Sequence, residues 1–248
     1  QRQMCIRDSR NSTIGKQLGF LKWFLKWSAN NGYHKNMAYL SFKPKLKTTE
    51  KRIIFLTWDE LMTVYNFPIP ESKKYLDRVR DVFCFCCFTS LRYSDVYNLK
   101  RFDIKNGALH ITTVKTADSL TIDLNKYSQA ILDKYDGVPF EDNKALPVIS
   151  NQKMNDYIKE LGQLCGLDQP ETVTYYVGNE RVDEVYPKYE LMGTHTGRRT
   201  FISNAIMMGI PPQVVMKWTG HSDYKAMKPY IAIADSAKAE AMKLFNEK

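Results

Sequence analysis

The sequence predicts a mainly α-helical protein with a small antiparallel β-sheet, an α+β fold. Apolar residues recur at helical spacing in several segments, and two short segments alternate in the manner of strands. The 248 residues are 44% hydrophobic and 25% charged, which is enough to bury a core in one large domain or two small ones. This composition excludes a disordered chain and a disulfide-held miniprotein. No apolar run reaches the length of about 18 residues that a transmembrane helix needs.

The N-terminal part predicts one amphipathic helix followed by a basic linker. Ile14, Leu18 and Leu25 lie near 3.6-residue spacing within 12–30, and an Asn-Asn-Gly sequence ends this segment. Residues 41–52 are basic and lack apolar periodicity, so they predict a linker.

The rest of the chain predicts helices interrupted by two hairpins. A capping box at Thr57–Glu60 begins a helix. The later elements are a long helix at 73–89, a short helix from Ser94, strands at 109–114 and 120–124 joined by a turn at 115–118, helices at 125–135 and 151–166, a second hairpin at 172–186, and helical structure from about 197 with breaks at Gly209, Pro211, Pro212 and Gly220.

The charge distribution points to nucleic acid as a partner. The formal net charge is +9, and residues 1–52 hold 12 Lys and Arg against two acidic residues. The remaining residues are close to neutral, so the excess lies in the first fifth of the chain. A basic membrane-surface protein is an alternative that only the charge supports.

Cysteine usage predicts a reducing compartment and no metal site. Cys84, Cys86 and Cys87 stand among phenylalanines and are interpreted as small core residues. Cys and His do not occur in the two closely spaced pairs that a zinc site needs. The first residues are not followed by the apolar segment of a signal peptide, so we expect a cytoplasmic protein.

Several polar residues occur in unusual surroundings. His195 and Arg198 share a helix face and suit an anion such as phosphate, although a solvated basic helix start is an alternative. Arg92 ends an apolar helix and must be paired or directed into a site, and a salt bridge to Asp95 is the structural alternative. Lys115 lies in the turn of the first predicted hairpin, and taken alone it would usually be interpreted as an exposed turn lysine.

Taken in order, these residues resemble the catalytic domain of the tyrosine recombinase (phage integrase) family over roughly 53–235. The resemblance rests on Thr-Ser-Leu-Arg-Tyr-Ser-Asp-Val around Arg92, the hairpin lysine Lys115, His-x-x-Arg-Arg-Thr from His195, Gly-His-Ser at His221, and Tyr230 nine residues later. The segments Pro187–Leu191 and Lys228–Ile231 are similar to those of integrases of mobile elements, such as conjugative transposons.

The resemblance implies cleavage and rejoining of double-stranded DNA through a 3′-phosphotyrosyl intermediate, without a metal or nucleotide cofactor. Tyr230 would be the nucleophile, with Arg92 and Arg198 holding the phosphate oxygens, His195 as base, Lys115 as acid and His221 donating to a phosphate oxygen. Asp95 is expected to orient Arg92 or neighbouring backbone. The predicted DNA contacts are Lys16, Lys22, Lys26, Lys43, Lys45, Lys47 and Arg199.

The resemblance also implies a domain division and an assembly. Residues 1–40 would be the remnant of a helical core-binding domain, 41–52 a linker and 53–248 the catalytic domain. We expect a monomer when free, a homotetramer in the synaptic complex, a bacterial nucleoid-associated location and a role in integrating or excising a mobile element. The segment Asp235–Phe245 would be a helix that docks on its own domain or on a neighbouring subunit.

Two residues depart from the family pattern, and two other functions compete. Ser90 stands where a glycine is usual and Thr219 where a leucine is usual, and we expect both to be harmless. The alternatives are a type IB topoisomerase that nicks and reseals DNA and a catalytically silent DNA-binding regulator. The spacing from Gly-His-Ser to Tyr230 favours a recombinase, and the complete set of catalytic side chains argues against a silent regulator.

Overall fold

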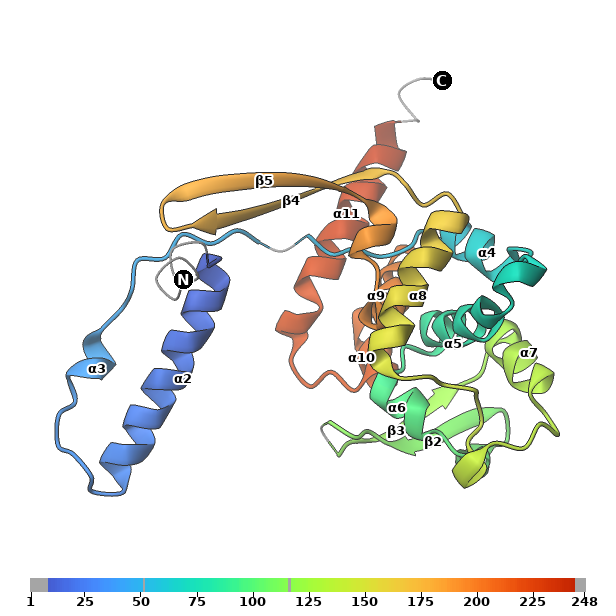
Figure 1. The fold of residues 1–248 in the computed structure, drawn as a ribbon, viewed down its shortest axis with the longest axis horizontal. Helices are drawn as coiled ribbons and strands as arrows, with labels where there is room; N and C mark the ends of the chain where they lie inside the picture. The colour runs from blue at the N-terminus through green and yellow to red at the C-terminus, as the bar shows by residue number, and fades with distance from the viewer. Residues whose placement is uncertain (1–8, 51, 116, 244–248) are drawn as a thin grey trace. The chain divides into compact units, whose positions relative to one another are not determined.

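The computed structural model describes residues 9–50, 52–115 and 117–243, which form two compact units (Figure 1). The first unit combines the segment up to Arg52 with the hairpin segment Pro170–Tyr186. The second contains Ile53–Gln169 and the chain from Pro187 onward. The division along the chain falls between Arg52 and Ile53, and the assignment of the two parts to domains stays a prediction. The hairpin lies within the predicted 53–248 domain but packs with the N-terminal segment instead.

The first unit consists of the helices α2 (Asn11–Asn30) and α3 (Ala38–Ser41) and an antiparallel hairpin of β4 (Pro170–Val177) and β5 (Glu180–Pro187). The helix predicted at 12–30 and the hairpin predicted at 172–186 are confirmed. The single turn of α3 was not expected, because four residues are too few to show apolar periodicity.

Asn11 holds this unit together. Its side chain is buried, and its Nδ2 donates to the carbonyl oxygens of Lys47 at 2.9 Å and Gly178 at 2.8 Å. The Gly178 amide donates back to Asn11 Oδ1 at 2.9 Å. The hydroxyl of Thr49 donates to the Thr174 carbonyl oxygen at 2.8 Å. The segment predicted as a linker is therefore fastened along the hairpin.

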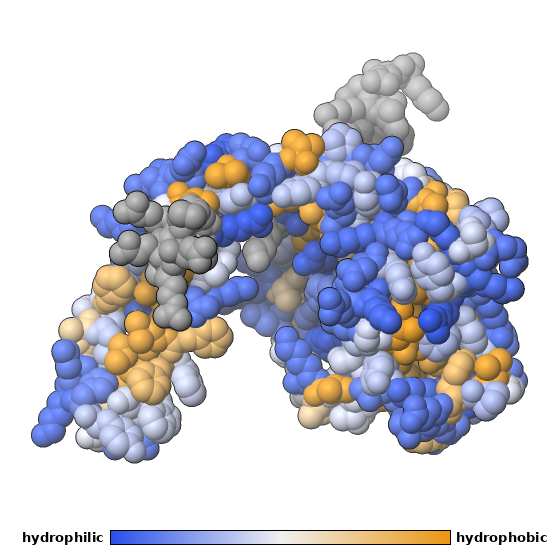
Figure 2. Space-filling model, in the orientation of Figure 1, coloured by the Kyte–Doolittle hydropathy of each residue, from blue (hydrophilic) through white to orange (hydrophobic). Residues whose placement is uncertain are grey.

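The apolar side of α2 remains largely exposed. Leu21 and Phe24 are 52% exposed, and Phe20 and Trp23 are more exposed still. Figure 2 shows hydrophobic residues gathered over this helix. The assignment of residues 1–40 to a core-binding domain stays a prediction.

The second unit carries the helices α4 (Trp58–Asn66), α5 (Tyr75–Thr89), α6 (Tyr93–Asn98), α7 (Lys126–Lys134), α8 (Asn151–Leu164), α9 (Thr194–Met207), α10 (Pro212–Thr219) and α11 (Lys228–Lys243). Its antiparallel sheet has the order β1 (Ile104–Lys105), β2 (Ala108–Thr112), β3 (Ser119–Asp123), with Ile111 opposite Leu120. Short 3₁₀ turns lie at Glu71–Lys73, Arg101–Asp103, Glu141–Asn143, Lys188–Leu191 and Tyr224–Ala226.

Most elements of this unit agree with the sequence. The capping box of α4 is present, since the Thr57 amide donates to Glu60 Oε2 at 2.7 Å and the Glu60 amide to Thr57 Oγ1 at 3.3 Å. The two-residue strand β1 was not predicted. The helix α9 begins at Thr194, three residues before the expected start, and α11 begins before the predicted tail helix. Leu244 and Phe245 of that tail lie outside the described residues.

The helix α5 forms the centre of the core. Its cysteines are free thiols and are buried, as predicted, and burial raises the pKa of Cys86 to about 12. The helix α9 packs closely against α5 at Gly197, where an added Cβ atom would lie 2.8 Å from Cys86 Cβ. This close packing fixes α9, which carries Arg198, relative to the end of α5, which Arg92 follows.

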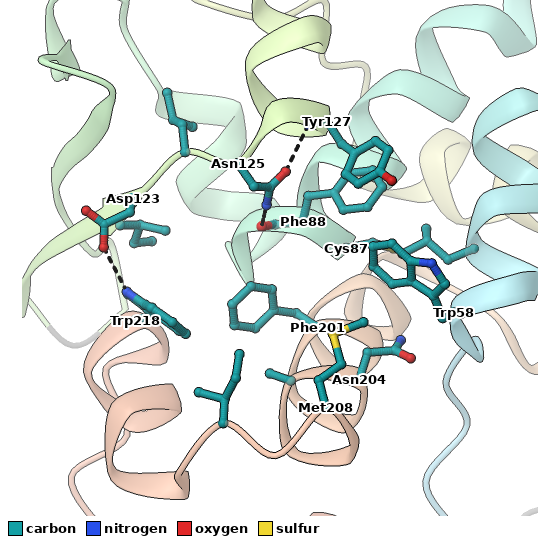
Figure 3. Close-up of a pocket in the computed structure, with 15 residues that line it drawn as sticks. Trp58, Cys87, Phe88, Asp123, Asn125, Tyr127, Phe201, Asn204, Met208 and Trp218 are labelled. Carbon is teal, nitrogen blue, oxygen red and sulfur yellow. Dashed lines mark hydrogen bonds between the residues drawn. The ribbon is translucent and has the colours of Figure 1, made fainter.

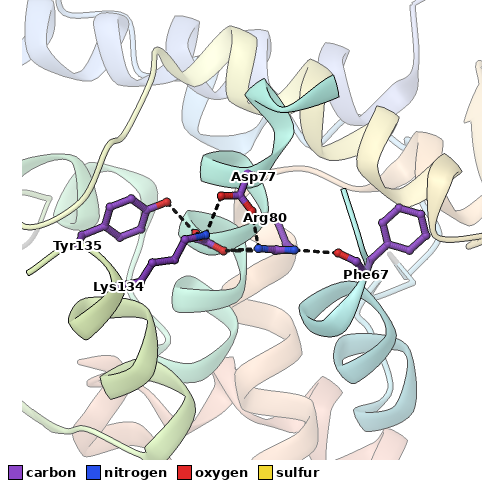
Figure 4. Close-up of polar contacts among 6 residues, drawn as sticks. Phe67, Asp77, Arg80, Lys134 and Tyr135 are labelled. Atoms are coloured by element: carbon purple, nitrogen blue, oxygen red, sulfur yellow. Dashed lines mark hydrogen bonds and ion pairs between the residues drawn. The ribbon is translucent and has the colours of Figure 1, made fainter. Parts of the chain in front are cut away.

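A polar network ties α5 to α7 and to the end of α4 (Figure 4). Asp81, almost fully buried, accepts from Lys134 Nζ at 2.6 Å and from the Tyr135 hydroxyl at 2.7 Å. Arg80 Nη1 donates to the Phe67 carbonyl oxygen at 2.8 Å, and Arg80 Nη2 lies 2.5 Å from Asp77. Burial and the acceptor Asp81 raise the pKa of the Tyr135 hydroxyl, so it stays a donor.

No helix in the described part of the chain is both long enough and apolar enough to cross a membrane.

Candidate active site

Arg92 lies directly after the sharp turn that ends α5. Ser90 makes this turn with a φ of 62°, in the left-handed region where a serine costs about 1–2 kcal/mol. Its Oγ donates to the Trp218 carbonyl oxygen at 3.3 Å, which ties the turn to α10. Arg92 Nη1 is buried and has no hydrogen-bond partner among the described residues. A buried, unsatisfied donor on a cation is costly unless a ligand completes it.

Arg198 comes from α9 and reaches the same turn. Its side chain is buried, and Nη1 donates to the Ser90 carbonyl oxygen at 3.0 Å while Nη2 donates to the Thr219 carbonyl oxygen. Burial, followed by the nearby charge of Arg92, lowers the pKa of Arg198 to about 10. The guanidinium is therefore still charged at neutral pH, and backbone carbonyls fix its position without neutralising it.

His221 follows α10, which ends at Gly220 with a φ of 65°. The imidazole Nε2 lies 3.3 Å from Arg198 Nη2, and Nδ1 lies 2.8 Å from Thr219 Oγ1. Burial and the charges of Arg198 and Arg92 lower the pKa of His221 to about 4. At neutral pH His221 is uncharged.

His195 lies in the first turn of α9, which is capped by Asn155 of α8 and by Thr196 of α9 itself. The Thr194 amide donates to Asn155 Oδ1 on α8 at 2.8 Å, and the Gly193 amide donates to Thr196 Oγ1 at 3.0 Å. The His195 side chain is exposed, yet desolvation by the surrounding protein lowers the pKa of His195 to about 4, aided by the charges of Arg199, Arg198, Arg92 and Lys115. It is neutral at pH 7 and able to accept a proton.

Asp95 connects two predicted site residues. Its Oδ2 lies 3.9 Å from Arg92 Nη1, and its Oδ1 accepts from the Val114 amide at 3.0 Å. Val114 begins the turn between β2 and β3 that carries the exposed Lys115. The predicted role of Asp95, to orient Arg92 or neighbouring backbone, therefore has a geometric basis in both respects.

Tyr230 lies in the first turn of α11 and packs against Ile202 and Val215 in a small core cluster. Burial raises the pKa of the Tyr230 hydroxyl, while the charges of Arg199 and Arg198 oppose the rise. The hydroxyl is thus protonated at neutral pH within the field of two arginines. Arg199, which the sequence assigned to DNA contact, is half-buried at this site and also lowers the pKa of His195.

The structure brings the predicted catalytic residues within electrostatic reach of one another, and it adds residues that the sequence did not suggest. Asn155 caps α9, Thr219 contacts His221, and the Ser90 carbonyl holds Arg198. Nothing in the local sequence of Asn155 marks it, because its partner lies 39 residues away. The sequence marked Thr219 as a departure from the family pattern beside the Gly-His pair, but it gave no sign of the contact with His221.

The predicted DNA-contacting lysines lie in the first unit. Lys16, Lys26, Lys43, Lys45 and Lys47 are exposed. Lys22 is half-buried and donates through Nζ to the Phe42 carbonyl oxygen. Lys22 is therefore the least available of these lysines for a phosphate contact.

A separate apolar pocket lies in the second unit (Figure 3). Trp58, Phe88, Tyr127, Phe201 and Trp218 form much of its lining, and Trp218 Nε1 donates to Asp123 Oδ2 at 3.3 Å. None of the predicted catalytic residues lines this pocket. Across the described segments, no group of three or more His, Cys, Asp or Glu is arranged to hold a metal ion.

Comparison with known proteins decides the family. Residues 54–237, most of the chain, match the family model described as the phage integrase family. The chain belongs to the phage integrase family. This result confirms the family predicted from the sequence motifs around Arg92, His195 and His221 and from their order along the chain.

Individual relatives of this phage integrase family member are distant in sequence. The chain is 22% identical over 238 residues to the tyrosine recombinase XerC of Thermodesulfovibrio yellowstonii (strain ATCC 51303 / DSM 11347 / YP87), covering 92% of this chain and 73% of the relative. Among solved structures, a λ integrase dimer bound to a COC′ core site matches with a TM-score of 0.62 and 15% identity, covering 91% of this chain and 80% of that one.

Two further structures show the same fold. The Tn1549 transposon integrase in complex with circular intermediate DNA has a TM-score of 0.60 and 16% identity, covering 96% of this chain and 81% of that one. The XerH recombinase bound to its palindromic difH substrate has a TM-score of 0.57 and 15% identity over 78% of this chain. This chain spans 54% of the length of that XerH chain. The predicted fold class is confirmed.

Proposed function

We propose that this protein is a site-specific DNA recombinase that cleaves and rejoins DNA through a covalent bond to Tyr230. The observation that carries the proposal is that, within the described residues, the buried Arg92 Nη1 has no hydrogen-bond partner, and the neighbouring Arg198 is held by two backbone carbonyls and His221. One carboxylate, Asp95 at 3.9 Å from Arg92, faces these two guanidinium groups, so the pair keeps a net positive charge that suits the two non-bridging oxygens of a phosphodiester. Donors fixed before the reaction stabilise the extra negative charge of the transition state.

The reaction assigned to the site is an exchange of phosphoester bonds. The Tyr230 oxygen attacks phosphorus and the bond to the 5′-oxygen breaks, giving a 3′-phosphotyrosyl link and a free 5′-hydroxyl. His195, neutral at pH 7, takes the phenolic proton, and Lys115 gives a proton to the leaving oxygen. The reverse steps rejoin the strand without ATP, because the phosphotyrosine keeps the energy of the broken bond. The arginines supply the charge stabilisation, so we also propose that no metal ion is required.

The burial of Tyr230 explains why the site needs this many cations. A phenol whose pKa is raised is a poor nucleophile at neutral pH. Arg198 and Arg199 already oppose that rise in the free protein. Proton removal by His195 would therefore lead to a tyrosinate that two arginines face.

The basic N-terminal segment is proposed to hold the DNA backbone. Its exposed lysines at 16, 26, 43, 45 and 47 provide positive charge without any predicted catalytic residue. Each phosphate contact contributes about 0.9 to the slope of log K against log salt concentration. Substituting Lys43, Lys45 and Lys47 together by Gln should reduce that slope by about 2–3. An unchanged slope would remove this segment from the DNA interface.

The biological setting is also a proposal. Solved structures similar in fold include a λ integrase tetramer bound to a Holliday junction and the Tn1549 transposon integrase on circular intermediate DNA. We propose that this chain acts in the same way on double-stranded DNA, as a monomer when free and a homotetramer in the synaptic complex, to integrate or excise a mobile element. This would take place in the bacterial cytoplasm at the nucleoid.

A covalent-capture experiment tests the proposed function. The protein is incubated with a pool of nicked duplexes of randomised sequence, in which a cleaved strand loses its short 5′-hydroxyl fragment and cannot be rejoined. We expect a DNA-linked band on a denaturing gel that persists in EDTA and is absent for Tyr230→Phe. Captured sequences then serve in a two-duplex strand-exchange assay, which a recombinase completes and a topoisomerase-like enzyme does not. Loss of the band in EDTA, or its persistence in Tyr230→Phe, would contradict the proposal.

A further inference from the structure

Thr219 lies at the junction between α10 and the candidate active site. It is the last residue of α10 and is completely buried. Its Oγ1 is 2.8 Å from His221 Nδ1 and 3.3 Å from the Met216 carbonyl oxygen. Its own carbonyl oxygen accepts from Arg198 Nη2. One residue therefore contacts both the imidazole and the guanidinium.

The hydrogen-bonding capacity of these groups allows one consistent arrangement of protons. A guanidinium has donors and no acceptor, so the contact of Arg198 Nη2 with His221 Nε2 requires a lone pair on Nε2. The neutral imidazole then carries its proton on Nδ1, which donates to Thr219 Oγ1. The Thr219 hydroxyl proton remains free to donate to the Met216 carbonyl oxygen. Every donor in this chain has an acceptor.

We propose that Thr219 is a positioning residue that, together with the donor Arg198 Nη2 on the other side of the ring, keeps the proton of His221 on Nδ1 and presents the Nε2 lone pair to the phosphate site. Without the Thr219 hydroxyl, the buried Nδ1 proton would have no acceptor, and the preference set by Arg198 would be weakened. This inference rests on the proposed function for its meaning in the reaction. The structural part concerns the free protein and does not depend on DNA. A valine would fill the same space but could not accept a hydrogen bond from Nδ1.

The arrangement predicts what happens when a phosphate oxygen arrives. An Nε2 lone pair repels a phosphate oxygen, so His221 must gain a proton from solvent at Nε2 before it can donate there. Arg198, Arg92 and His195 are the titratable groups that act on His221, and burial together with the charges of the two arginines lowers its pKa and keeps it neutral in the free protein. The negative phosphate offsets their charge and favours the protonated ring. The bond from Nδ1 to Thr219 is kept in both states, so the ring does not have to turn over.

The first test is a measurement of the His221 tautomer in the 248-residue protein without DNA. Long-range ¹H–¹⁵N correlation spectra at pH 7 distinguish a nitrogen that carries a proton from one that does not, and a His221→Gln variant assigns the signals. We expect the Nδ1-protonated form in the wild type and in Thr219→Ser, and a mixture of both tautomers in Thr219→Val. A wild-type His221 protonated on Nε2, or a Thr219→Val spectrum identical to the wild type, would overturn the proposal.

The second test measures single-turnover cleavage of a captured nicked duplex. We expect Thr219→Val to cleave about tenfold more slowly, equivalent to the loss of one hydrogen bond, and Thr219→Ser to restore the rate to within about threefold. Thr63→Val is the matched control, because it removes a hydroxyl that bonds a helix carbonyl on α4, 2.9 Å away and outside the site. Equal slowing by Ser and Val would assign Thr219 a packing role only. If no protein cleaves but the tautomer shifts as expected, the proposed function fails while the role of Thr219 stands.

Discussion

The close contact between α9 and α5 predicts that Gly197→Ala inactivates the protein. The added Cβ atom would lie 2.8 Å from Cys86 Cβ and 3.4 Å from the backbone atoms Cys86 C and Cys87 N. Carbon atoms pack at about 3.5–4.0 Å, so α9 must move away by about 1 Å. The 3.0 Å bond from Arg198 Nη1 to the Ser90 carbonyl oxygen would then lengthen to about 4 Å and be lost.

Two opposing effects set the magnitude. Alanine is favoured over glycine in a helix interior by about 1 kcal/mol. Overpacking against a rigid backbone costs about 1–3 kcal/mol, and a hydrogen bond from a charged donor contributes about 1.5–3 kcal/mol. The strain and the lost hydrogen bond outweigh the gain in helix propensity, so we expect the free energy of unfolding to fall by about 1.5–5 kcal/mol. A displacement of about 1 Å in a catalytic group should slow cleavage by about 100-fold.

Urea unfolding and single-turnover cleavage measure these two effects. Gly19→Ala is the matched control, because Gly19 is also helical, on α2, and an added Cβ there meets no atom within 4 Å. It should leave cleavage unchanged and stability equal or slightly higher. Cys86→Ala should not rescue Gly197→Ala, since the clash involves the Cβ atom that alanine keeps. A Gly197→Ala protein that is as stable and as active as the wild type would refute the reasoning.

Three further changes test other parts of the structure. Asp95→Asn should slow cleavage by about tenfold and Asp95→Ala by about 100-fold, because the amide oxygen can still hold the hairpin backbone; equal rates for the two would contradict this. Asp81→Asn should lower the free energy of unfolding by about 2–4 kcal/mol in urea, with little change in the activity of the folded fraction, because the buried carboxylate holds two helices together. The folded-state pKa values of His195 and His221 lie below the ordinary value of 6.5, so the unfolded chain binds more protons and stability should fall as pH drops from about 6.5 to 4. After allowance for solvent screening we expect about 1 kcal/mol for each histidine, and a double His→Asn variant that loses as much stability as the wild type between pH 7 and pH 5 would disprove it.

The sequence was most informative where a pattern is local. Helix α4 follows from its capping box, and α2 from its apolar spacing and the Asn-Asn-Gly end. The sequence motifs around Arg92, His195 and His221 identified the candidate site residues and their order along the chain. The structure then placed these residues within electrostatic reach, which spacing along the chain could not establish.

What the sequence missed depends on contacts between distant segments. The start of α9 was placed too late because its cap, Asn155, comes from another helix. The hairpin at 172–186 was placed in the catalytic domain, but Asn11 fastens its turn to the N-terminal unit. The two departures from the family pattern are the most instructive. The hydroxyl of Ser90 donates to the Trp218 carbonyl oxygen, and the hydroxyl of Thr219 contacts His221 Nδ1. The glycine and leucine that are usual at these positions could make neither contact.

Peptide mapping of the covalent complex tests the central claim most directly. Trypsin digestion of the captured complex, followed by nuclease treatment and mass spectrometry, locates the residue that retains a nucleotide. We predict that the nucleotide remains on the peptide containing Tyr230, attached through a 3′-phosphate. Attachment to any other residue, or a 5′-phosphate linkage, would contradict the account.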